Sequence, residues 1–525
     1  MPDQINDLFI IGGGINGAGI ARDAQGRGLQ VTLAEMNDLA SATSSASTKL
    51  FHGGLRYLEY FEIKLVKKAL IERETLLKAM PHISWPMRFV LPYHQDMRFE
   101  TSTPASRLLS FLMPWAKGRR PAWMIRLGLF LYDHLGGRGI LPGTTTLDLG
   151  VDAAGAPLDD KFEQAFEYSD CWVEDARLVV LNARDAADRG AEILVRTKVI
   201  SAVRDGVLWR IETENEATGE RRTHLARALV NAGGPWVEDI VKGVARINTT
   251  KGIRLVQGSH IVTKSLFEHG KCYFFQGEDG RIIFAIPYET DFTLIGTTET
   301  EFQSDPANAT CTDEEADYLL TLANRYFKRQ ISRKDIAWSY SGVRPLYADG
   351  SKSATAATRD YVLSLNQNGP PILSIFGGKI TTYRKLAEGV LKRLAPYFPD
   401  ATQSWTAGVP LPGGDFPVDG VAAQVDGLLT EFPFMDRTWA LRLIRAYGTD
   451  ARNILADAKH EEDLGVGFGA TLTEAEVTWL MQKEFARNAE DIVWRRSKLG
   501  LRMTKEEIAE LEEWMLSQPL ARSVD

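Results

Sequence analysis

The chain has 525 residues, of which 44% are hydrophobic and 25% are charged, and its formal net charge is −8. This length predicts two or three domains, the composition excludes disordered and fibrous proteins, and the acidic balance excludes a nucleic-acid-binding surface over the whole chain. The three cysteines, Cys171, Cys272 and Cys311, have no CxxC spacing, so we expect free thiols in a reducing compartment and neither a metal site nor a disulfide scaffold.

The N-terminal sequence MPDQINDLFIIGGG carries acidic residues where a signal peptide needs positive charge, and its apolar run stops at Gly12. No other run approaches the roughly 18 apolar residues of a membrane-spanning helix. We therefore expect a cytoplasmic protein whose contact with any membrane is peripheral.

The start of the chain predicts a βαβ unit. Residues 7–11 form a short apolar run typical of a buried strand, residues 15–27 have a helical pattern, and residues 30–34 predict a second strand. Glu35 follows this strand directly, at the position where an acidic side chain would bind the ribose hydroxyls of an adenosine.

The loop between the first strand and the helix has the GxGxxG spacing, with Gly12, Gly14 and Gly17 as its glycines. The first glycine allows a tight turn, the second lets the backbone approach a pyrophosphate, and the third lets helix and sheet pack closely. The start of the helix supplies amide donors to the phosphates. The loop therefore predicts a dinucleotide site, but it does not by itself separate NAD from FAD.

Further elements follow in chain order: an amphipathic helix over 57–80, a β-meander over 191–230, strands over 253–300, a helix over 313–330, and a strand, Gly-Gly and helix over 370–395. Turns are predicted at Gly206 and Gly219 within the meander, and Thr312 is the expected N-cap of the helix that follows it. Residues 399–417 contain several prolines and glycines and predict a linker, after which the pattern is mostly helical.

Nine segments spread over most of the chain resemble FAD-dependent glycerol-3-phosphate dehydrogenases, in particular the aerobic, respiratory bacterial enzymes. They are ATSSASTKLFHGGLRYLE (42–59), FEYSDCWVEDARLV (166–179), LVNAGGPWV (229–237), IRLVQGSHIV (253–262), LIGTTE (294–299), YSGVRPL (340–346), TRDY (358–361), FGGKITTYRKLAE (376–388) and WRRSKLG (494–500). The resemblance implies an α/β fold: an FAD-binding Rossmann-like domain, a substrate domain similar to that of D-amino acid oxidase on a mixed β-sheet, and a C-terminal α-helical domain.

The resemblance also implies domain boundaries. The FAD-binding domain is expected to be discontinuous, over 1–80, 170–245 and 340–395. The substrate domain is expected over 81–169 and 246–339, and the helical domain over 400–525. Residues 95–118 look like additional sequence relative to the family pattern. Whether the helical domain serves dimer contacts or regulation stays open.

FAD is the expected cofactor, and the residues expected to bind it come from the glycine loop, from Glu35, from the segment over 42–57 and from three later motifs. They are Gly12, Gly14, Ile15, Asn16, Gly17, Glu35, Thr43, Ser44, Ser45, Ser47, Lys49, Leu50, His52, Gly53, Gly54, Ala232, Gly233, Gly342, Gly378, Lys379, Ile380 and Thr381. The backbone amides that follow Gly377 would stabilise negative charge on reduced flavin.

The resemblance implies oxidation of sn-glycerol 3-phosphate to dihydroxyacetone phosphate. The phosphate requires cations, and the expected substrate-binding residues are Arg56, Tyr57, Arg344, Arg359 and Lys379. The expected catalytic residues are His52, Arg344 and Lys379. His52 would take the proton of the substrate hydroxyl, with Arg344 or a water as the alternative, and Lys379 would act on the flavin or on the substrate.

Electrons are expected to pass to ubiquinone or menaquinone at the inner face of the cell membrane. Residues 98–138 contain seven basic and two acidic residues, a net charge of +5, interleaved with aromatic residues and methionine. Such a segment suits peripheral docking on anionic lipid, although a helix packed on its own core would have a similar composition. An oxidase that uses oxygen, an NAD-dependent dehydrogenase, a non-enzymatic flavin-fold module and a homodimer stay open at this point.

Overall fold

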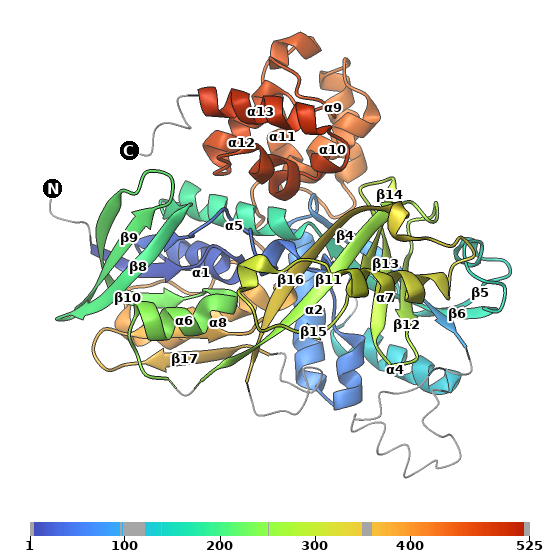
Figure 1. Ribbon diagram of the computed structural model, residues 1–525, viewed down its shortest axis with the longest axis horizontal. Helices are drawn as coiled ribbons and strands as arrows, with labels where there is room; N and C mark the ends of the chain where they lie inside the picture. Colours follow the sequence, from blue (N-terminus) through green and yellow to red (C-terminus); the bar gives the residue numbers. More distant parts are fainter. Residues whose placement is uncertain are drawn as a thin grey trace.

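The computed structural model describes residues 5–94, 97, 121–137, 139–249, 251–348 and 360–518. Two β-sheets lie beneath a separate group of C-terminal helices (Figure 1). Among the described residues, no helix combines the length and the apolar character needed to cross a membrane.

The first sheet has the strand order β17-β18-β10-β1-β2-β7, and a β8–β9 hairpin extends it from β10. Its strands are β1 (Ile5–Ile11), β2 (Val31–Ala34), β7 (Glu192–Leu194), β8 (Thr197–Asp205), β9 (Leu208–Asn215), β10 (Arg221–Asn231), β17 (Val362–Asn366) and β18 (Ile372–Phe376). The five strands from β18 to β7 are parallel. A parallel sheet needs helices on its faces, and α1 (Ile15–Gly26) and α8 (Tyr383–Leu394) pack their apolar sides on this sheet.

The second sheet has ten strands in the order β15-β11-β14-β13-β12-β4-β6-β3, with β16 paired to β11 and β5 paired to β6. Its strands are β3 (Leu50–Phe51), β4 (Ser84–Tyr93), β5 (Thr145–Asp148), β6 (Gln164–Val173), β11 (Ile253–Lys264), β12 (Cys272–Gln276), β13 (Ile282–Tyr288), β14 (Phe292–Gly296), β15 (Thr300–Glu301) and β16 (Ile336–Tyr347). The sheet is mixed, because β4 and β12 are parallel whereas its other strand pairs are antiparallel.

Adjacent residues of the second sheet enter different cores, as the alternation of side chains along a strand requires. Phe275 packs with α7 (Asp313–Asn324), whereas Phe274 packs with α2 (Ile63–Ala79) and α4 (Ala122–Leu135). The sheet is therefore covered by helices on both faces.

The C-terminal domain consists of α9 (Val421–Glu431), α10 (Arg437–Tyr447), α11 (Ala451–Leu455), α12 (Glu474–Lys483), the π-helix η13 (Asp491–Arg496) and α13 (Lys505–Ser517). These helices enclose an apolar core of their own. They lie over α5 (Asp175–Asp188), which packs in turn against α1 of the first domain (Figure 1). The fold class predicted from the sequence, with its two α/β parts and its helical domain, is confirmed.

Two turns and one helix cap lie where the local sequence pattern predicted them. Gly206 and Gly219 form the turns of the β8–β9 and β9–β10 hairpins with positive φ angles of 62° and 67°. Thr312 caps α7 in a capping box with Glu315, although this helix ends at Asn324 rather than near 330. The helix predicted over 57–80 was too long, because Phe61 adopts a φ of 58° between the 3-10 helix η2 (Leu55–Tyr60) and α2.

Candidate active site

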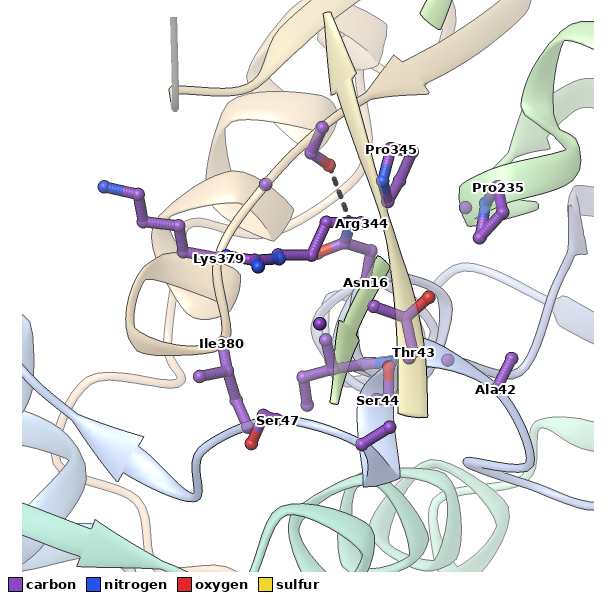
Figure 2. A pocket seen from close by; sticks show the side chains of 18 of the residues that line it. Asn16, Ala42, Thr43, Ser44, Ser47, Pro235, Arg344, Pro345, Lys379 and Ile380 are labelled. Carbon is purple, nitrogen blue, oxygen red and sulfur yellow. Dashed lines mark hydrogen bonds between the residues drawn. The ribbon is translucent and has the colours of Figure 1, made fainter. Parts of the chain in front are cut away.

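A cavity of about 740 Å³ lies at the carboxyl ends of β1, β2, β10 and β18, where an open α/β sheet usually binds its ligand. Its wall also contains the 3-10 helices η1 (Thr43–Ser45), η5 (Gly234–Trp236) and η9 (Ile380–Thr382) and part of β16. Figure 2 shows side chains from these segments around the cavity, among them Thr43, Ser44, Arg344 and Ile380.

The glycine loop has the close backbone approaches that its GxGxxG spacing predicts. Gly12 has a φ of 107°, and a Cβ atom there would lie 2.6 Å from the carbonyl oxygen of Ala232. A Cβ atom at Gly17 would lie 1.9 Å from the carbonyl oxygen of Gly12. A side chain at Gly12 would collide with the backbone that follows β10, and one at Gly17 would push α1 away from the turn at Gly12, so either would disturb the approach to the helix N-terminus.

Glu35 lines the cavity at the end of β2, as the sequence predicted. Its Oε2 accepts a hydrogen bond from Gly13 N at 2.6 Å, and its Oε1 accepts one from Asn37 N at 2.9 Å. Burial raises the pKa of the Glu35 carboxyl, and the two amides oppose this shift by stabilising the charged form. Each carboxylate oxygen retains a lone pair that can accept a ribose hydroxyl.

Asn16 and the turn after β18 give the cavity a second polar region. The Oδ1 atom of Asn16 is buried and has no hydrogen-bond partner among the described residues, while its Nδ2 donates to Gly377 O at 3.4 Å. Gly377 and Gly378 have φ angles of 78° and 114°, so the backbone passes close to the cavity without side chains. Together with Glu35 and the glycine loop, these groups fit a flavin dinucleotide.

Most of the residues expected to bind FAD line this one cavity. They are Gly12, Gly14, Ile15, Asn16, Glu35, Thr43, Ser44, Ser47, Leu50, His52, Gly54, Ala232, Gly233, Gly342, Gly378, Lys379, Ile380 and Thr381. A side chain would not fit at Gly342, because a Cβ atom there would lie 2.6 Å from the Cβ of Ala46 on the facing segment.

Four expected residues do not line the cavity: Gly17, Ser45, Lys49 and Gly53. Lys49 was predicted as a cofactor ligand, but its ammonium is fully buried and pairs with Asp175 at 2.6 Å. The amide of Gly53 donates to the hydroxyl of Tyr132 at 2.7 Å. Both residues shape the segment that forms the wall and do not face the cavity.

The cavity also receives the groups expected to bind substrate. His52, Tyr57, Arg344 and Lys379 line it together, and the Lys379 ammonium lies 3.7 Å from the centre of the Tyr57 ring. Arg359 lies outside the described residues, and so does the side chain of Arg56.

Arg344 reaches the cavity from β16 across a glycine of β11. Its Nη2 donates to Thr298 O at 3.1 Å. A Cβ atom at Gly258 would lie 2.8 Å from this Nη2, so a side chain on β11 would displace the guanidinium. Gly258 belongs to the segment IRLVQGSHIV. Its contact with Arg344 arises from the pairing of β11 with β16 and could not be predicted from the segment alone.

His260 was not predicted as a site residue. The ring lines the cavity, is only 2% exposed, stacks on Tyr340 and has its Nε2 3.0 Å from the hydroxyl of Thr48. Burial, together with the charges of Lys49 and Arg344, lowers the pKa of His260 well below its ordinary value. The imidazole is therefore neutral, and its Nδ1 has no partner among the described residues.

Asp170 was also missed, although it lines the cavity beneath the glycines that follow His52. Its Oδ1 accepts hydrogen bonds from Arg73 at 2.5 Å, from Tyr132 at 2.8 Å and from the Gly53 amide at 3.3 Å. Burial raises the pKa of Asp170, and Arg73 opposes the shift. This network fixes the path of the backbone between His52 and Tyr57.

The Lys49–Asp175 pair leads to a stability prediction. Lys49→Met leaves the Asp175 carboxylate buried without its counter-charge, so the free energy of unfolding should fall by about 3–5 kcal/mol in denaturant titrations. Adding Asp175→Asn to this variant removes the uncompensated charge and should restore part of the loss. Lys67→Met changes an exposed lysine and serves as the control. An equal, small loss in Lys49→Met and Lys67→Met would contradict the assignment.

Two family models match the chain. Residues 7–384 match the FAD dependent oxidoreductases, and residues 404–515 match the C-terminal domain of alpha-glycerophosphate oxidase. The first match contains the glycine loop and every other segment of the cavity described above, and the second coincides with the helical domain.

Individual relatives agree with these models over nearly the whole length. The chain is 50% identical to D-erythritol 1-phosphate dehydrogenase of Brucella abortus, with 97% of each chain covered. It is 46% identical to the aerobic glycerol-3-phosphate dehydrogenase of Escherichia coli, with 98% of each covered. The solved structure of glycerol-3-phosphate dehydrogenase from Bacillus halodurans complexed with FAD aligns with a TM-score of 0.72 at 26% identity, covering 100% of this chain and 96% of that one. The chain therefore belongs to the FAD-dependent glycerol-3-phosphate dehydrogenase family, and its cofactor is FAD.

Proposed function

We propose that the protein oxidises sn-glycerol 3-phosphate to dihydroxyacetone phosphate and passes the electrons to a membrane quinone. The observation that carries this proposal is that Arg344, Lys379 and His52 line the same cavity as the dinucleotide loop. A phosphate ester requires cations, a secondary alcohol requires a proton acceptor, and both must lie beside the flavin.

FAD, when bound, accepts the hydrogen at carbon 2 of the substrate together with two electrons. The chain supplies the groups that make this transfer possible. The guanidinium of Arg344 binds phosphate oxygens or the reacting hydroxyl, and its bond to Thr298 O fixes its direction. Lys379 adds a second positive charge, and Arg56 and Arg359 remain further candidates for the phosphate. His52 accepts the hydroxyl proton as the carbonyl of the product forms.

D-erythritol 1-phosphate is a second candidate substrate. The relative from Brucella abortus that shares 50% identity with this chain is named for that compound. Both substrates have a phosphate ester and at least one secondary hydroxyl, and they differ in chain length, so the same cations and the same base would serve either one.

The substrate can be identified from the flavin itself. Anaerobic addition of sn-glycerol 3-phosphate to the purified holoenzyme should bleach the flavin absorbance, with a higher limiting rate over Kd than D-erythritol 1-phosphate gives. Glycerol without phosphate should be a poor reductant, because charge-assisted contacts to the phosphate are lost. Faster reduction by the erythritol compound would assign the second substrate, and no reduction by either would reject both.

The two cavity histidines allow a matched test of the base. His52→Ala should slow anaerobic flavin reduction by about 100-fold, the usual contribution of a general base. His260→Ala should have the smaller effect on the reduction rate, because burial lowers the pKa of His260 and so makes its imidazole a weaker proton acceptor. The reverse order, with flavin still bound to both variants, would transfer the role of base to His260.

We further propose that α2 and α4 form the membrane-facing surface, at the inner face of the cell membrane. Trp123, Leu127, Phe130 and Leu131 are exposed and follow one side of α4, while Leu129 and Tyr132 on its other side are buried. Neighbouring α2 adds exposed Ile63, Lys64 and Lys67, and Phe61, which precedes this helix, is exposed as well. Figure 1 shows α4 at the end of the molecule opposite the C-terminal helices.

This surface has features of a membrane-docking segment and also of a helix packed on its own core, the two interpretations that the sequence left open. One side of α4 is packed on the substrate domain, as a core helix would be, and the other side presents aromatic and apolar groups to solvent. Aromatic residues beside lysines favour the interface of an anionic bilayer, where a lipid-soluble quinone can reach reduced flavin. Most of the segment predicted to dock, including residues 98–118, Arg119 and Arg120, lies outside the described residues.

Replacing Trp123, Leu127, Phe130 and Leu131 together by serine should release the protein from anionic vesicles in sedimentation assays. Quinone-linked turnover should fall, whereas anaerobic flavin reduction should stay within about twofold of the parent, because these side chains do not line the cavity. Val151→Ser with Val207→Ser alters apolar residues elsewhere that are even more exposed and should leave vesicle binding intact. Unchanged sedimentation of the fourfold variant, or rapid oxygen consumption without quinone, would contradict the proposal.

A further inference from the structure

Residues 36–40 form the part of the cavity wall that follows Glu35. Met36, Asn37 and Ala40 line the cavity. Ala40 has a φ of 60°, a conformation that a residue with a side chain keeps only when its surroundings hold it. The backbone of this segment therefore depends on contacts made outside the βαβ unit.

Asp38 makes those contacts on the side of the segment that does not line the cavity. Arg496 donates from Nη1 to Oδ2 at 2.5 Å and from Nη2 to Oδ1 at 2.7 Å, and Arg495 donates from Nε to Oδ2 at 2.5 Å. Asp38 and Arg496 are both buried. A bidentate arginine–carboxylate contact fixes both the position and the plane of the carboxylate.

Both arginines belong to η13 of the C-terminal domain, and that helix is itself held firmly. Arg496 donates to the carbonyl oxygen of Glu484 from Nε and Nη2, at 3.0 and 2.7 Å. The buried carboxylate of Asp491 accepts from Arg495 at 2.6 Å and from Arg196 at 2.9 Å. Burial alone would raise the pKa of Asp491, but the surrounding guanidinium groups hold it below its ordinary value.

Arg196 closes the network on the first domain. Its backbone amide donates to Asn37 O at 2.8 Å, next to Asp38, while its side chain reaches Asp491 of η13. The neighbouring Thr197 amide donates to Glu35 O at 2.8 Å. The segment is thus attached to the helical domain at two adjacent residues, directly through Asp38 and, at Asn37, through Arg196.

We propose that the C-terminal domain is part of the FAD site, because Arg495 and Arg496 hold Asp38 and thereby position residues 36–40 for the adenosine half of the cofactor. The three residues are positioning residues that act through the cavity wall. Linkage requires the reverse effect as well: bound FAD stabilises the docking of the helical domain. The role of this domain is then cofactor retention, whichever polyol phosphate the enzyme oxidises.

The test compares FAD release from the holoenzymes of two variants at one interface. Asp38→Asn keeps the size of the side chain and removes its charge. Asp450→Asn breaks a similar pair, to Arg184 at 2.9 Å between α5 and the helical domain, without touching a residue that lines the cavity. After dilution, Asp38→Asn should release FAD about tenfold faster than the parent, measured by the rise in free-flavin fluorescence, and Asp450→Asn should release it at the parent rate.

If Asp38→Asn fails to fold, Arg495→Lys provides a second variant. It keeps the positive charge, and the Arg495 side chain is less buried than that of Arg496. It should release FAD at an intermediate rate, and excess FAD should raise its Tm by less than that of the parent. Parent-like release from Arg495→Lys and from folded Asp38→Asn would overturn the proposal. Release from Asp450→Asn as fast as from Asp38→Asn would also overturn it, because general loosening of the interface would then account for the effect.

Discussion

The buried ion pair between Lys49 and Asp175 is the interaction on which the shape of the active site depends. Lys49 adopts a φ of 60° and donates from Nζ to Asp175 and to the carbonyl oxygen of Ser45. The other oxygen of Asp175 accepts from the hydroxyl of Ser47 at 2.7 Å. A charge removed from water needs such partners, so the pair sets the path of the segment that carries Thr43, Ser44 and Ser47 into the cavity wall.

Asp175 also begins α5, and this helix connects the active site to the helical domain. Arg177 donates two hydrogen bonds to the Glu484 carboxylate, and Arg184 pairs with Asp450. Together with the contacts of Asp38, these pairs make the interface rich in buried charge. A small displacement of the helical domain along this interface would leave several buried charges without partners at once, which explains why a domain with its own core is nevertheless held in one position against the flavin domain.

The sequence revealed local features well and distant pairs poorly. The glycine loop, Glu35, the turns at Gly206 and Gly219 and the cap at Thr312 could be predicted because each signal lies within a few residues. Helix α5 was not predicted, and its polar side is not exposed to solvent, because Arg177, Arg184 and Asp185 are paired with residues of distant segments. Asp170 with Arg73, and Asp38 with Arg496, are separated by 97 and 458 residues and leave no local pattern. Lys49 was misjudged because its neighbours in the chain face the cavity while its own side chain turns away.

The order of strands in the first sheet has a consequence for synthesis of the protein. β1 ends at Ile11, yet its parallel neighbour β10 begins at Arg221, and β18, which pairs with β10, begins only at Ile372. At about 5–20 residues per second, the ribosome needs on the order of ten seconds or more to make the residues between β1 and β10. The nascent chain therefore carries the β1–β2 pair with both outer edges exposed until β7 and β10 have been made, which happens only at residue 231 of 525, and the N-terminal half is the part of the polypeptide for which protection by chaperones matters most.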